Sequence, residues 1–472
     1  MSDKGLCFLT IGELSKLIKK KEVSPVEVTT SFLERINQLD GQINAYITVL
    51  EDEARQSSQE AERAILSGNY LGPLHGVPIA VKDLFLTKGI RTTAGSKILA
   101  DFFPKEDATV IQRLKEAGAV IIGKTNLHEF AYGSTTDNPH YGATRNPWDM
   151  ERIPGGSSGG SAAAVVASLC SGSLGSDTGG SIREPAALCG IVGIKPTYGR
   201  VSRFGVIPLA WSLDHAGPIT KDVEDSALIL NAIAGRDPRD SASSDVPVPD
   251  YTRALGGEVK GLRLGIPKEY FFEEIDDEIG EHVKKAIGVL QTLGVAAEEV
   301  SLPYVKYSRT LLWILVGAEA SSYHEPFFRT RIEEYGRDVR ANLEVAQFML
   351  ASHYLKAQRV RNILRENLLE VLKKVDVIVC PTTPVPAPKI GERDFKIRMG
   401  DRETTVTGGL GRLTCPFNLS GLPAISLPCG FTSLGLPIGL QIAGRPFDEE
   451  TVLKVARAYE MNTDWHQRRP SV

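Results

Sequence analysis

The feature that most constrains this chain is a stretch of small residues near its middle. Residues 155–180 contain eight glycines and seven serines. Glycine permits positive φ and lets backbone N–H groups approach a ligand closely. A flexible linker has a similar composition, but the Ala-Ala-Ala-Val-Val-Ala run at 162–167 favours a helix that Ser161 can cap. We therefore predict a folded region that faces a ligand.

Short apolar runs predict a mixed β-sheet. They alternate with glycine-rich turns and helical stretches, which is typical of buried strands covered by helices. These runs occupy residues 78–81, 119–122, 190–194, 262–267, 297–302 and 375–380. Two more runs, at 424–428 and 437–442, flank a glycine-containing turn and predict a hairpin. We expect a fold of the α/β class.

Helical periodicity predicts additions to this sheet. Residues 1–70 form an N-terminal helical segment, in which Ser24 can cap the helix that Pro25 opens. Residues 303–375 carry long amphipathic patterns and are expected to form a helical insertion. The sequence contains no internal repeat and no low-complexity tract, and we interpret residues 1–472 as a single domain.

Composition and charge argue against several classes of function. A net charge of −4, from 54 basic and 58 acidic residues, gives no reason to expect nucleic acid or an anionic membrane as a partner. The first residues lack the layout of a signal peptide, and no apolar run is long enough to span a membrane. The six cysteines form no C-x-x-C pair, and the H-E-x-x-H motif is absent. We expect a cytoplasmic protein with reduced thiols and without a metal ion.

Two short patterns match known motifs but are set aside. Residues 118–125 fit the phosphate-loop pattern G-x-x-x-x-G-K-[ST], yet the four intervening residues are Ala, Val, Ile and Ile. These residues indicate a buried strand, whose N–H groups bind the sheet and not a phosphate. Residues 156–160 fit the nucleophile-elbow pattern G-x-S-x-G, which requires a buried strand directly before it. The preceding residues, 146–154, contain two prolines and three charges, so we accept neither motif.

Three segments share a distinctive pattern of glycine, serine and other small residues. They read Gly155-Gly-Ser-Ser-Gly-Gly-Ser-Ala-Ala-Ala164, Gly175-Ser-Asp-Thr-Gly-Gly-Ser-Ile-Arg183 and Gly193-Ile-Lys-Pro-Thr-Tyr-Gly-Arg200. With these segments the chain resembles the amidase signature family, and residues 76–83 and 421–430 look like that family's catalytic-lysine strand and late strand. The resemblance implies a three-layer α/β/α domain around a large twisted mixed sheet, with 71–235 as the catalytic signature core. It also implies hydrolysis of amides without a metal or an organic cofactor.

The same resemblance implies a catalytic Ser-cisSer-Lys triad. Lys82 matches the base, Ser157 the relay serine and Ser181 the nucleophile, and the peptide bond before Ser157 is expected to be cis. A serine hydroxyl is a weak nucleophile until a neighbour takes its proton, and a lysine can take it only when neutral. Ile-Ala-Val before Lys82 indicates a buried strand, and burial disfavours the ammonium form. On the residues alone, Lys124 and Lys195 remain alternative bases because they also follow apolar runs.

Other residues are expected to hold the substrate. Negative charge that develops on the carbonyl oxygen needs fixed donors. The candidates are the backbone N–H groups of Thr178, Gly179, Gly180 and Ser181. Asp177 and Arg183 are close enough in sequence to brace that turn as an ion pair. By the family resemblance, Phe130, Ala131, Tyr132 and Trp211 are candidates to line the acyl pocket, and a place in the ordinary core is the alternative for each. Such a lining favours an apolar or aromatic acyl group.

Later segments separate two groups within the family. The A subunit of the glutamyl-tRNA(Gln) amidotransferase typically has an acidic residue shortly before a Pro-x-Asn-Leu run, where it holds the amino group of glutamine. The corresponding residues 411–418 contain no carboxylate here, although Arg361 could match that protein's grip on the glutamine carboxylate. Free glutamine would then be held at one end only. We therefore favour an amidase that acts alone, and keep as alternatives an inactive relative and the glutamine-hydrolysing subunit. We expect a small-molecule amide as the partner and no nucleic acid, and leave a homodimer and the identity of the amide open.

Overall fold

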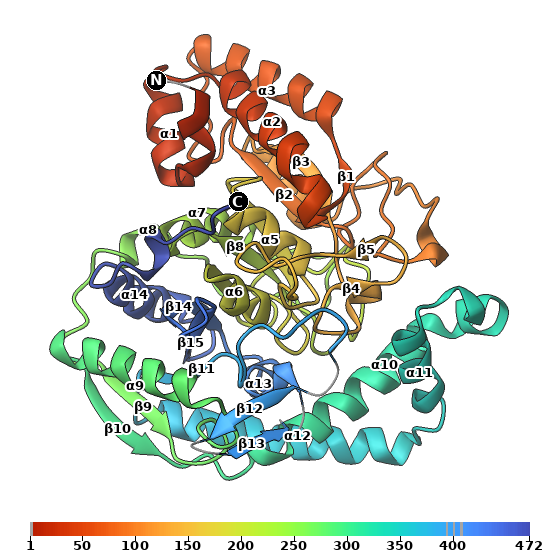
Figure 1. Cartoon of the computed structure of the whole chain (residues 1–472), viewed down its shortest axis with the longest axis vertical. Helices are drawn as coiled ribbons and strands as arrows, with labels where there is room; N and C mark the ends of the chain where they lie inside the picture. The colour runs from red at the N-terminus through yellow and green to blue at the C-terminus, as the bar shows by residue number, and fades with distance from the viewer. Residues whose placement is uncertain (1–2, 393–394, 400–401, 406–408) are drawn as a thin grey trace.

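A mixed 11-stranded sheet runs through the part of the molecule that the structure describes (Figure 1). The structure is a computed structural model that describes residues 3–392, 395–399, 402–405 and 409–472. From one edge to the other, the strands are β1 (Tyr46–Val49), β3 (Val120–Thr125), β2 (Pro78–Lys82), β6 (Gly172–Ser176), β8 (Ala216–Thr220), β7 (Val192–Lys195), β14 (Ala424–Phe431), β15 (Pro437–Gly444), β11 (Val377–Pro381), β9 (Arg263–Pro267) and β10 (Ala296–Val300). Parallel and antiparallel pairs both occur, and β14 with β15 forms the predicted hairpin. The expected α/β fold is confirmed.

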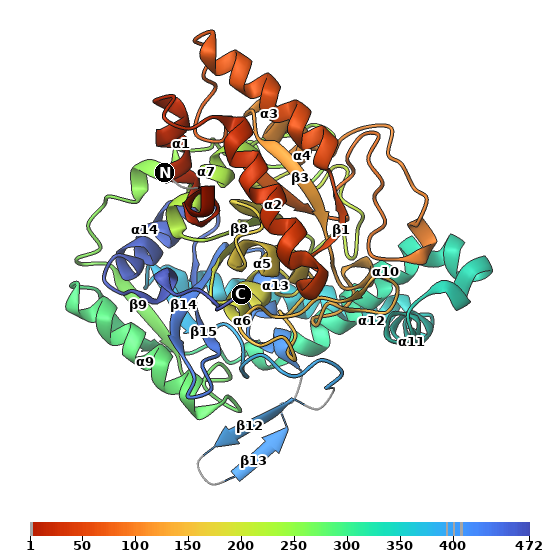
Figure 2. The ribbon, with the colours of Figure 1, turned by 45° about the horizontal axis from the view of Figure 1, so that its top comes forward.

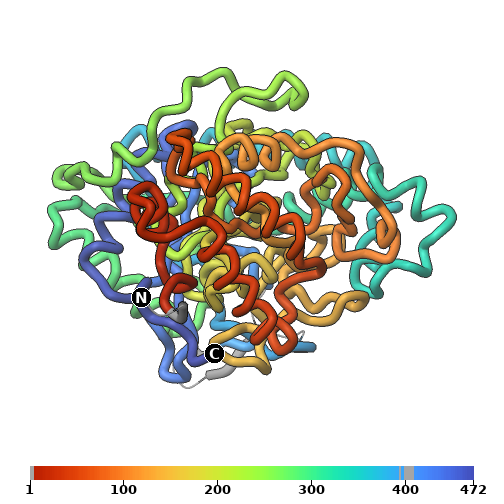
Figure 3. Tube along the Cα trace, turned by 90° about the horizontal axis from the view of Figure 1, so that it is seen from above, coloured from red at the N-terminus to blue at the C-terminus, as the bar shows by residue number. Residues whose placement is uncertain are grey.

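Helices cover both faces of this sheet. In chain order they are α1 (Ile11–Lys19), α2 (Pro25–Ile43), α3 (Glu51–Leu66), α4 (Thr109–Glu116), α5 (Gly159–Val166), α6 (Arg183–Cys189), α7 (Val223–Ile233), α8 (Tyr251–Ala254), α9 (Asp277–Thr292), α10 (Ser308–Arg331), α11 (Arg337–Ala346), α12 (Ala351–Leu372), α13 (Cys415–Ser420) and α14 (Glu449–Glu460). Helices α5 and α6 pack on each other and on the central strands, whereas α7, α8 and α14 form a second group. Seen from above, the N-terminal helices lie across the central part of the chain (Figure 3).

Two parts of the chain extend beyond the sheet. Helices α10 and α11 reach one side of the molecule (Figures 1 and 3). The strands β12 (Lys396–Met399) and β13 (Arg402–Thr405) pair as an antiparallel hairpin that stands away from the main sheet (Figure 2). A second small pair, β4 (Asp137–Asn138) and β5 (Gly142–Ala143), belongs to a loop. Neither small pair was predicted from the sequence. The proposed division into an N-terminal segment, a signature core and an insertion stays a prediction.

The predicted helix starts are correct at one place and wrong at another. At α2 the Glu27 N–H donates to the Ser24 hydroxyl at 3.1 Å and Pro25 occupies the first turn, as expected. Helix α5, in contrast, begins earlier than predicted, with Ser158 as its N-cap residue. Ser161 lies inside the helix, and its hydroxyl donates to the Leu174 carbonyl at 3.1 Å. Ser161 therefore ties α5 to a strand and does not cap it.

That strand, β6, is the element of the glycine–serine stretch that the sequence did not predict. Its residues, Gly-Ser-Leu-Gly-Ser, lack an apolar alternation, yet all five are buried between β2 and β8. Small residues are required here because neighbours approach closely. A Cβ atom on Gly175 would lie 2.9 Å from the Ser158 hydroxyl, and one on Gly172 would lie 2.9 Å from the Ile229 side chain.

The register of β2 and β6 decides where polar side chains meet. The two strands are parallel neighbours, with Val81 opposite Leu174. Because the carboxyl ends of parallel neighbours lie at the same edge of a sheet, Lys82 at the end of β2 is next to Ser176 at the end of β6. Ligands of open α/β sheets commonly bind beyond this edge. The rejected phosphate-loop pattern forms β3, which pairs with strands on both sides.

We expect Gly160→Ala to destabilise the fold. A Cβ atom at Gly160 would lie 2.4 Å from the Asn126 carbonyl oxygen and 2.5 Å from that of Ala45, so α5 would have to shift. Overpacking of this kind costs about 1–3 kcal/mol. Gly288→Ala is the matched control, because Gly288 lies inside α9 with open space around it. That change should stabilise the helix by about 0.5–1 kcal/mol. Urea unfolding of both variants checks this, and equal effects would contradict it.

Candidate active site

Lys82 is fully buried at the carboxyl end of β2. Its Nζ atom lies 2.7 Å from the hydroxyl oxygen of Ser157, 2.9 Å from that of Ser158 and 2.8 Å from that of Ser176. The peptide bond between Gly156 and Ser157 is cis, as the family resemblance led us to expect. Residues from β2, from the turn before α5 and from β6 therefore converge on one amine.

The hydroxyls around Lys82 suit a neutral amine, which has two N–H donors and one lone pair. The Ser158 hydroxyl can donate to the Ser176 carbonyl oxygen at 3.2 Å, which leaves its oxygen free to accept from Lys82. The Ser176 hydroxyl can accept the second N–H group. The lone pair is then left for Ser157, whose hydroxyl can donate to it. This arrangement allows Lys82 to accept a proton from Ser157.

Burial also favours the neutral form of Lys82. It lowers the pKa of Lys82 well below the ordinary value, although the negative charges of Asp177 and Asp214 act in the opposite direction. An unperturbed lysine costs about 4–5 kcal/mol to deprotonate at pH 7, and desolvation of the ammonium reduces this cost. The site thus favours the neutral amine that a lysine base requires.

The two alternative lysines are engaged elsewhere. Lys124 lies 3.4 Å from the Asp83 carboxylate, and its pKa is lowered to about 8 by burial. Lys195 donates to the Leu422 carbonyl at 2.6 Å and lies 3.2 Å from the His215 ring. No hydrogen bond joins either amine to the serines around Lys82 in the described part of the chain. The geometry therefore favours Lys82 over both.

Ser181 lies in the turn between β6 and α6. The Ser158 N–H donates to the Ser181 carbonyl at 3.3 Å, which joins this turn to the segment that carries Ser157. Within the described residues, four consecutive backbone N–H groups of the turn have no intramolecular acceptor. They belong to Thr178, Gly179, Gly180 and Ser181. Gly180 has a φ of +145°, which side-chain-bearing residues rarely adopt. Such free donors can stabilise an oxyanion.

A buried ion pair braces this turn, as the sequence predicted. The Arg183 Nη2 and Nε atoms lie 2.9 and 3.0 Å from the two carboxylate oxygens of Asp177. The other guanidinium N–H groups donate to Thr414, Gln441 and Asn418. All five donors of Arg183 are therefore used. Burial by itself would raise the pKa of Asp177, but Arg183 holds it below the ordinary value.

A cavity of about 160 Å³ opens beside Ser181. Ala131 and Tyr132 line it, together with Thr178 and Gly179. Trp211 does not: it is 48% exposed and lines other hollows, so the structure corrects its expected place in the acyl pocket. Lining residues that the sequence did not single out include Glu184, Leu209, Arg309, Leu312, Trp313 and Val316. Most of them come from α10, whose place over Ser181 depends on tertiary packing.

The loop that carries Ala131 has an unusual backbone. Phe130 and Ala131 both have positive φ, at +50° and +58°. Such conformations cost non-glycine residues about 1–3 kcal/mol each and cluster at functional sites. The Phe130 ring is buried and packs edge-on against the His324 ring of α10, with ring centroids 4.4 Å apart. Phe130 therefore anchors the loop, while Tyr132, whose pKa burial raises to about 12, faces the cavity.

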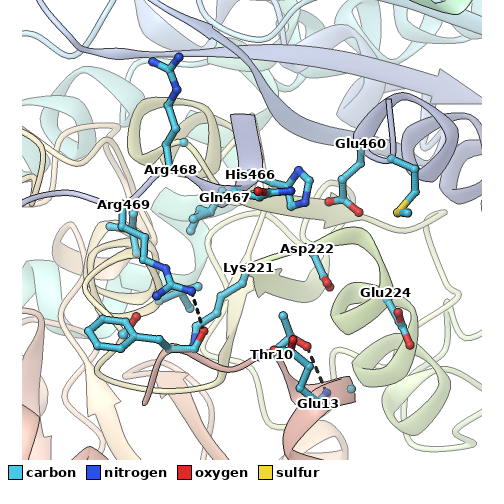
Figure 4. A pocket seen from close by; sticks show the side chains of 18 of the residues that line it. Thr10, Glu13, Lys221, Asp222, Glu224, Glu460, His466, Gln467, Arg468 and Arg469 are labelled. Atoms are coloured by element: carbon cyan, nitrogen blue, oxygen red, sulfur yellow. Dashed lines mark hydrogen bonds between the residues drawn. The ribbon is translucent and has the colours of Figure 1, made fainter. Parts of the chain in front are cut away.

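A larger cavity, of about 620 Å³, lies between the two ends of the chain (Figure 4). Residues of both charges line it, including Glu13, Asp222, Arg468 and Arg469. None of the residues around Lys82 or Ser181 contributes to it. Among the described residues, no group of three or more His, Cys, Asp or Glu side chains is arranged to hold a metal ion. No described helix is long and apolar enough to cross a membrane.

A mixed sheet with this lysine–serine cluster at the carboxyl ends of its strands β2 and β6 defines an amide-cleaving enzyme of the α/β class. The Amidase family profile matches residues 27–453, so the chain belongs to the amidase family. It is 46% identical over 490 residues to the A subunit of glutamyl-tRNA(Gln) amidotransferase from Moorella thermoacetica, covering 99% of each chain. The crystal structure of the same protein from Thermotoga maritima is similar, with a TM-score of 0.81 and 40% identity over 97% of this chain and 95% of the other. A chain of a vestigial protein complex that reveals the evolutionary origins of an s-triazine catabolic enzyme has a TM-score of 0.91 and 35% identity over 96% and 98%.

These relatives correct our expectation about partners. We expected a chain that acts alone on a small molecule, with no nucleic acid and with a homodimer left open. The curated relatives of Moorella thermoacetica and Geobacillus kaustophilus are each named as a subunit of an amidotransferase that is named for a tRNA. The expectation of a solitary chain is therefore wrong. The expectation that the chain resembles a stand-alone amidase more than the A subunit is likewise not supported.

We expect the pH dependence of activity to report Lys82. If neutral Lys82 is the base, kcat/KM is high above the lysine pKa and falls as pH drops through it, on a single limb. Lys82→Ala should remove this limb and lower kcat/KM by about 10⁴-fold or more. Lys82→Arg should not restore activity, because a guanidinium keeps its proton. Lys195→Ala is the control and should keep the limb. An unchanged profile in Lys82→Ala would identify a different base.

Arg183→Met should destabilise the protein strongly. The change leaves the Asp177 carboxylate buried without its partner, which costs about 3–5 kcal/mol. Arg236→Met is the control, because the Arg236–Asp245 pair is exposed and such pairs contribute about 1 kcal/mol or less. The depressed pKa of Asp177 contributes stability above about pH 4, and this contribution is lost as pH falls through the folded-state pKa. Urea unfolding at pH 7 and pH 3 measures both effects, and similar losses in the two variants would contradict the assignment.

Proposed function

We propose that this chain is the amide-cleaving subunit of an assembly, and that it hydrolyses glutamine through an acyl-enzyme on Ser181. The observation that carries the proposal is the contact between the buried Lys82 amine and the Ser157 hydroxyl at 2.7 Å. The next residue, Ser158, donates its backbone N–H to the Ser181 carbonyl, which ties this contact to the expected nucleophile. Identity of 46–47% over nearly the full length to curated A subunits supports the choice of glutamine and of an assembly.

The proposed reaction begins with proton transfer. Ser181 attacks the amide carbonyl carbon while its proton passes to Ser157, whose own proton passes to Lys82. The carbonyl π bond becomes an oxyanion, which the free N–H groups of the 178–181 turn stabilise. The C–N bond then breaks, and the proton returns from Lys82 through Ser157 to the leaving nitrogen. Water attacks the resulting ester with the same base, which regenerates Ser181 and releases a carboxylate. The net change is amide plus water to carboxylate plus ammonium.

A second candidate is an amide with an apolar acyl group. Much of the cavity wall is apolar, with Leu209, Leu312, Trp313 and Val316 facing the space beside Ser181. Such a wall gives an apolar acyl chain about 25 cal/mol for each Å² that it removes from water. The chemistry at Ser181 is the same for both candidates, so the substrate alone separates them. A carboxyl and a guanidinium in the same cavity favour a charged acyl group.

We expect ammonia release from glutamine, and none after Ser181→Ala. The purified chain, and the complex that carries it, are incubated with glutamine, asparagine, and primary amides of apolar acids. Ammonia and the carboxylic acid are then quantified. Ser202→Ala is the control, because Ser202 is buried in a different hydrogen-bond network with Asp237. If apolar amides are hydrolysed and glutamine is not, the second candidate replaces the first. Activity retained in Ser181→Ala would overturn both.

A further inference from the structure

The cavity beside Ser181 contains one carboxyl and one guanidinium group that the catalytic steps do not use. Glu184 lies in the first turn of α6, three residues after Ser181, and Arg309 lies in the first turn of α10. Glu184 and Ser181 line the same cavity, so the Glu184 side chain is on the side of α6 that faces this cavity. These two residues frame the space that the acyl group would occupy.

Glu184 is buried with one carboxyl oxygen unsatisfied. Its Oε1 atom lies 3.2 Å from the Thr414 hydroxyl, whereas Oε2 is buried and has no hydrogen-bond partner. The residue is 2% exposed. Buried polar atoms are nearly always paired in folded proteins, so an orphaned oxygen in the wall of a cavity indicates that a ligand supplies the partner.

Two glycines make room for this carboxyl group. A Cβ atom on Gly180 would lie 2.1 Å from Glu184 Oε1, and one on Gly411 would lie 2.7 Å from the same atom. Gly411 belongs to the segment in which the sequence showed no acidic residue. The carboxylate missing from that segment is thus supplied by α6 at nearly the same place. This arrangement argues against the expectation that glutamine would be held at one end only.

Arg309 supplies the opposite charge. Within the described residues its guanidinium makes no hydrogen bond or ion pair, and it lines the same cavity as Glu184. It is close enough for its charge to oppose the rise in pKa that burial causes at Glu184 and Tyr132. A free guanidinium binds a carboxylate well, because two parallel N–H donors match its two oxygens. Arg361, the grip expected from the sequence, instead donates to backbone oxygens of Leu419 and Ser212.

We propose that Glu184 and Arg309 together recognise an acyl group that carries both an ammonium and a carboxylate, as in an α-amino acid amide. The ammonium would donate to Glu184 Oε2 and the carboxylate would accept from Arg309, while the amide carbon lies at Ser181. The cavity of about 160 Å³ suits a short acyl chain of this kind. This inference rests on the proposed function, because it specifies the substrate of the same site.

The charge state of Glu184 adds a signature to this recognition. Burial and the nearby Asp177 charge raise the pKa of Glu184 to about 8, while Arg309, the Thr414 hydroxyl and Arg183 act in the opposite direction. Cys415 of α13 is also close by. With a pKa of about 8, Glu184 is mainly protonated at pH 7, and an ammonium binds best to the ionised form. Affinity for such a ligand should rise as pH increases toward 8.

Binding to a Ser181→Ala variant tests the proposal without turnover. Calorimetry compares glutamine with glutaramate, which has the same amide and carboxylate but no amino group. Adding Glu184→Gln should weaken glutamine binding by roughly 10- to 150-fold, because a hydrogen bond to a charged group is lost. It should change glutaramate binding by less than about threefold. Arg309→Met should weaken both ligands, whereas Lys306→Met, which removes a nearby charge outside the cavity, should weaken neither.

Two further measurements guard against misfolding and against the wrong substrate. Glu184→Ala with Gly411→Asp returns a carboxylate to the same place and should restore glutamine binding. The increase of glutamine affinity between pH 6.5 and 8.5 should vanish in Glu184→Gln. Equal glutamine affinity with and without the Glu184 carboxylate, or no glutamine binding at all, overturns the inference. Failure of the proposed function gives a different result: the chain with Ser181 intact would release no ammonia from glutamine.

Discussion

The buried ion pair between Asp177 and Arg183 is the interaction on which the rest of the site depends. It joins the end of β6 to the first residue of α6, and through Asn418 and Gln441 it also reaches α13 and β15. The turn between Asp177 and Arg183 is only a few residues long and contains consecutive glycines, which by themselves would leave it free to move. Fixing both of its ends holds the free N–H groups and Ser181 in one arrangement. Preorganised donors of this kind need no rearrangement during the reaction.

The lysine at the end of β2 illustrates a second constraint. A buried amine without a carboxylate in contact is unfavourable as an ammonium ion, so the protein surrounds it with hydroxyl groups that suit the neutral form. Lys124 shows the contrasting solution, because its amine lies 3.4 Å from the Asp83 carboxylate. Two lysines at the ends of neighbouring strands therefore differ in function through their immediate neighbours. The register separates them as well, because Lys124 lies opposite Val81 and Lys82 lies opposite Thr125.

Sequence reasoning succeeded where a pattern is local. Apolar runs predicted β2, β3 and the β14–β15 hairpin, and the Ser24–Pro25 pair predicted the start of α2. The strand β6 was missed because its small residues are buried by neighbours that are distant in the chain. Trp211 was misplaced for the same reason: exposure is a property of the folded molecule. Glu184 directly follows the recognised segment that ends at Arg183, but its value as a binding group depends on the space that Gly411 leaves beside its carboxyl group. The sequence near Glu184 or near Gly411 does not by itself show that the two segments meet.

The catalytic residues and much of the cavity wall come from different halves of the chain, which affects how this enzyme can change over generations. Lys82 ends β2, Ser157 lies directly before α5 and Ser181 lies in the turn between β6 and α6, so all three come from the first half of the chain. Much of the wall that meets the acyl group comes from α10 and from the segment around Gly411, which follow much later in the chain. Substitutions in these later segments can therefore alter which molecule is accepted while the bond-breaking apparatus stays intact. The architecture is evolvable, because one conserved reaction can be redirected to new compounds by mutations that leave its catalysts untouched.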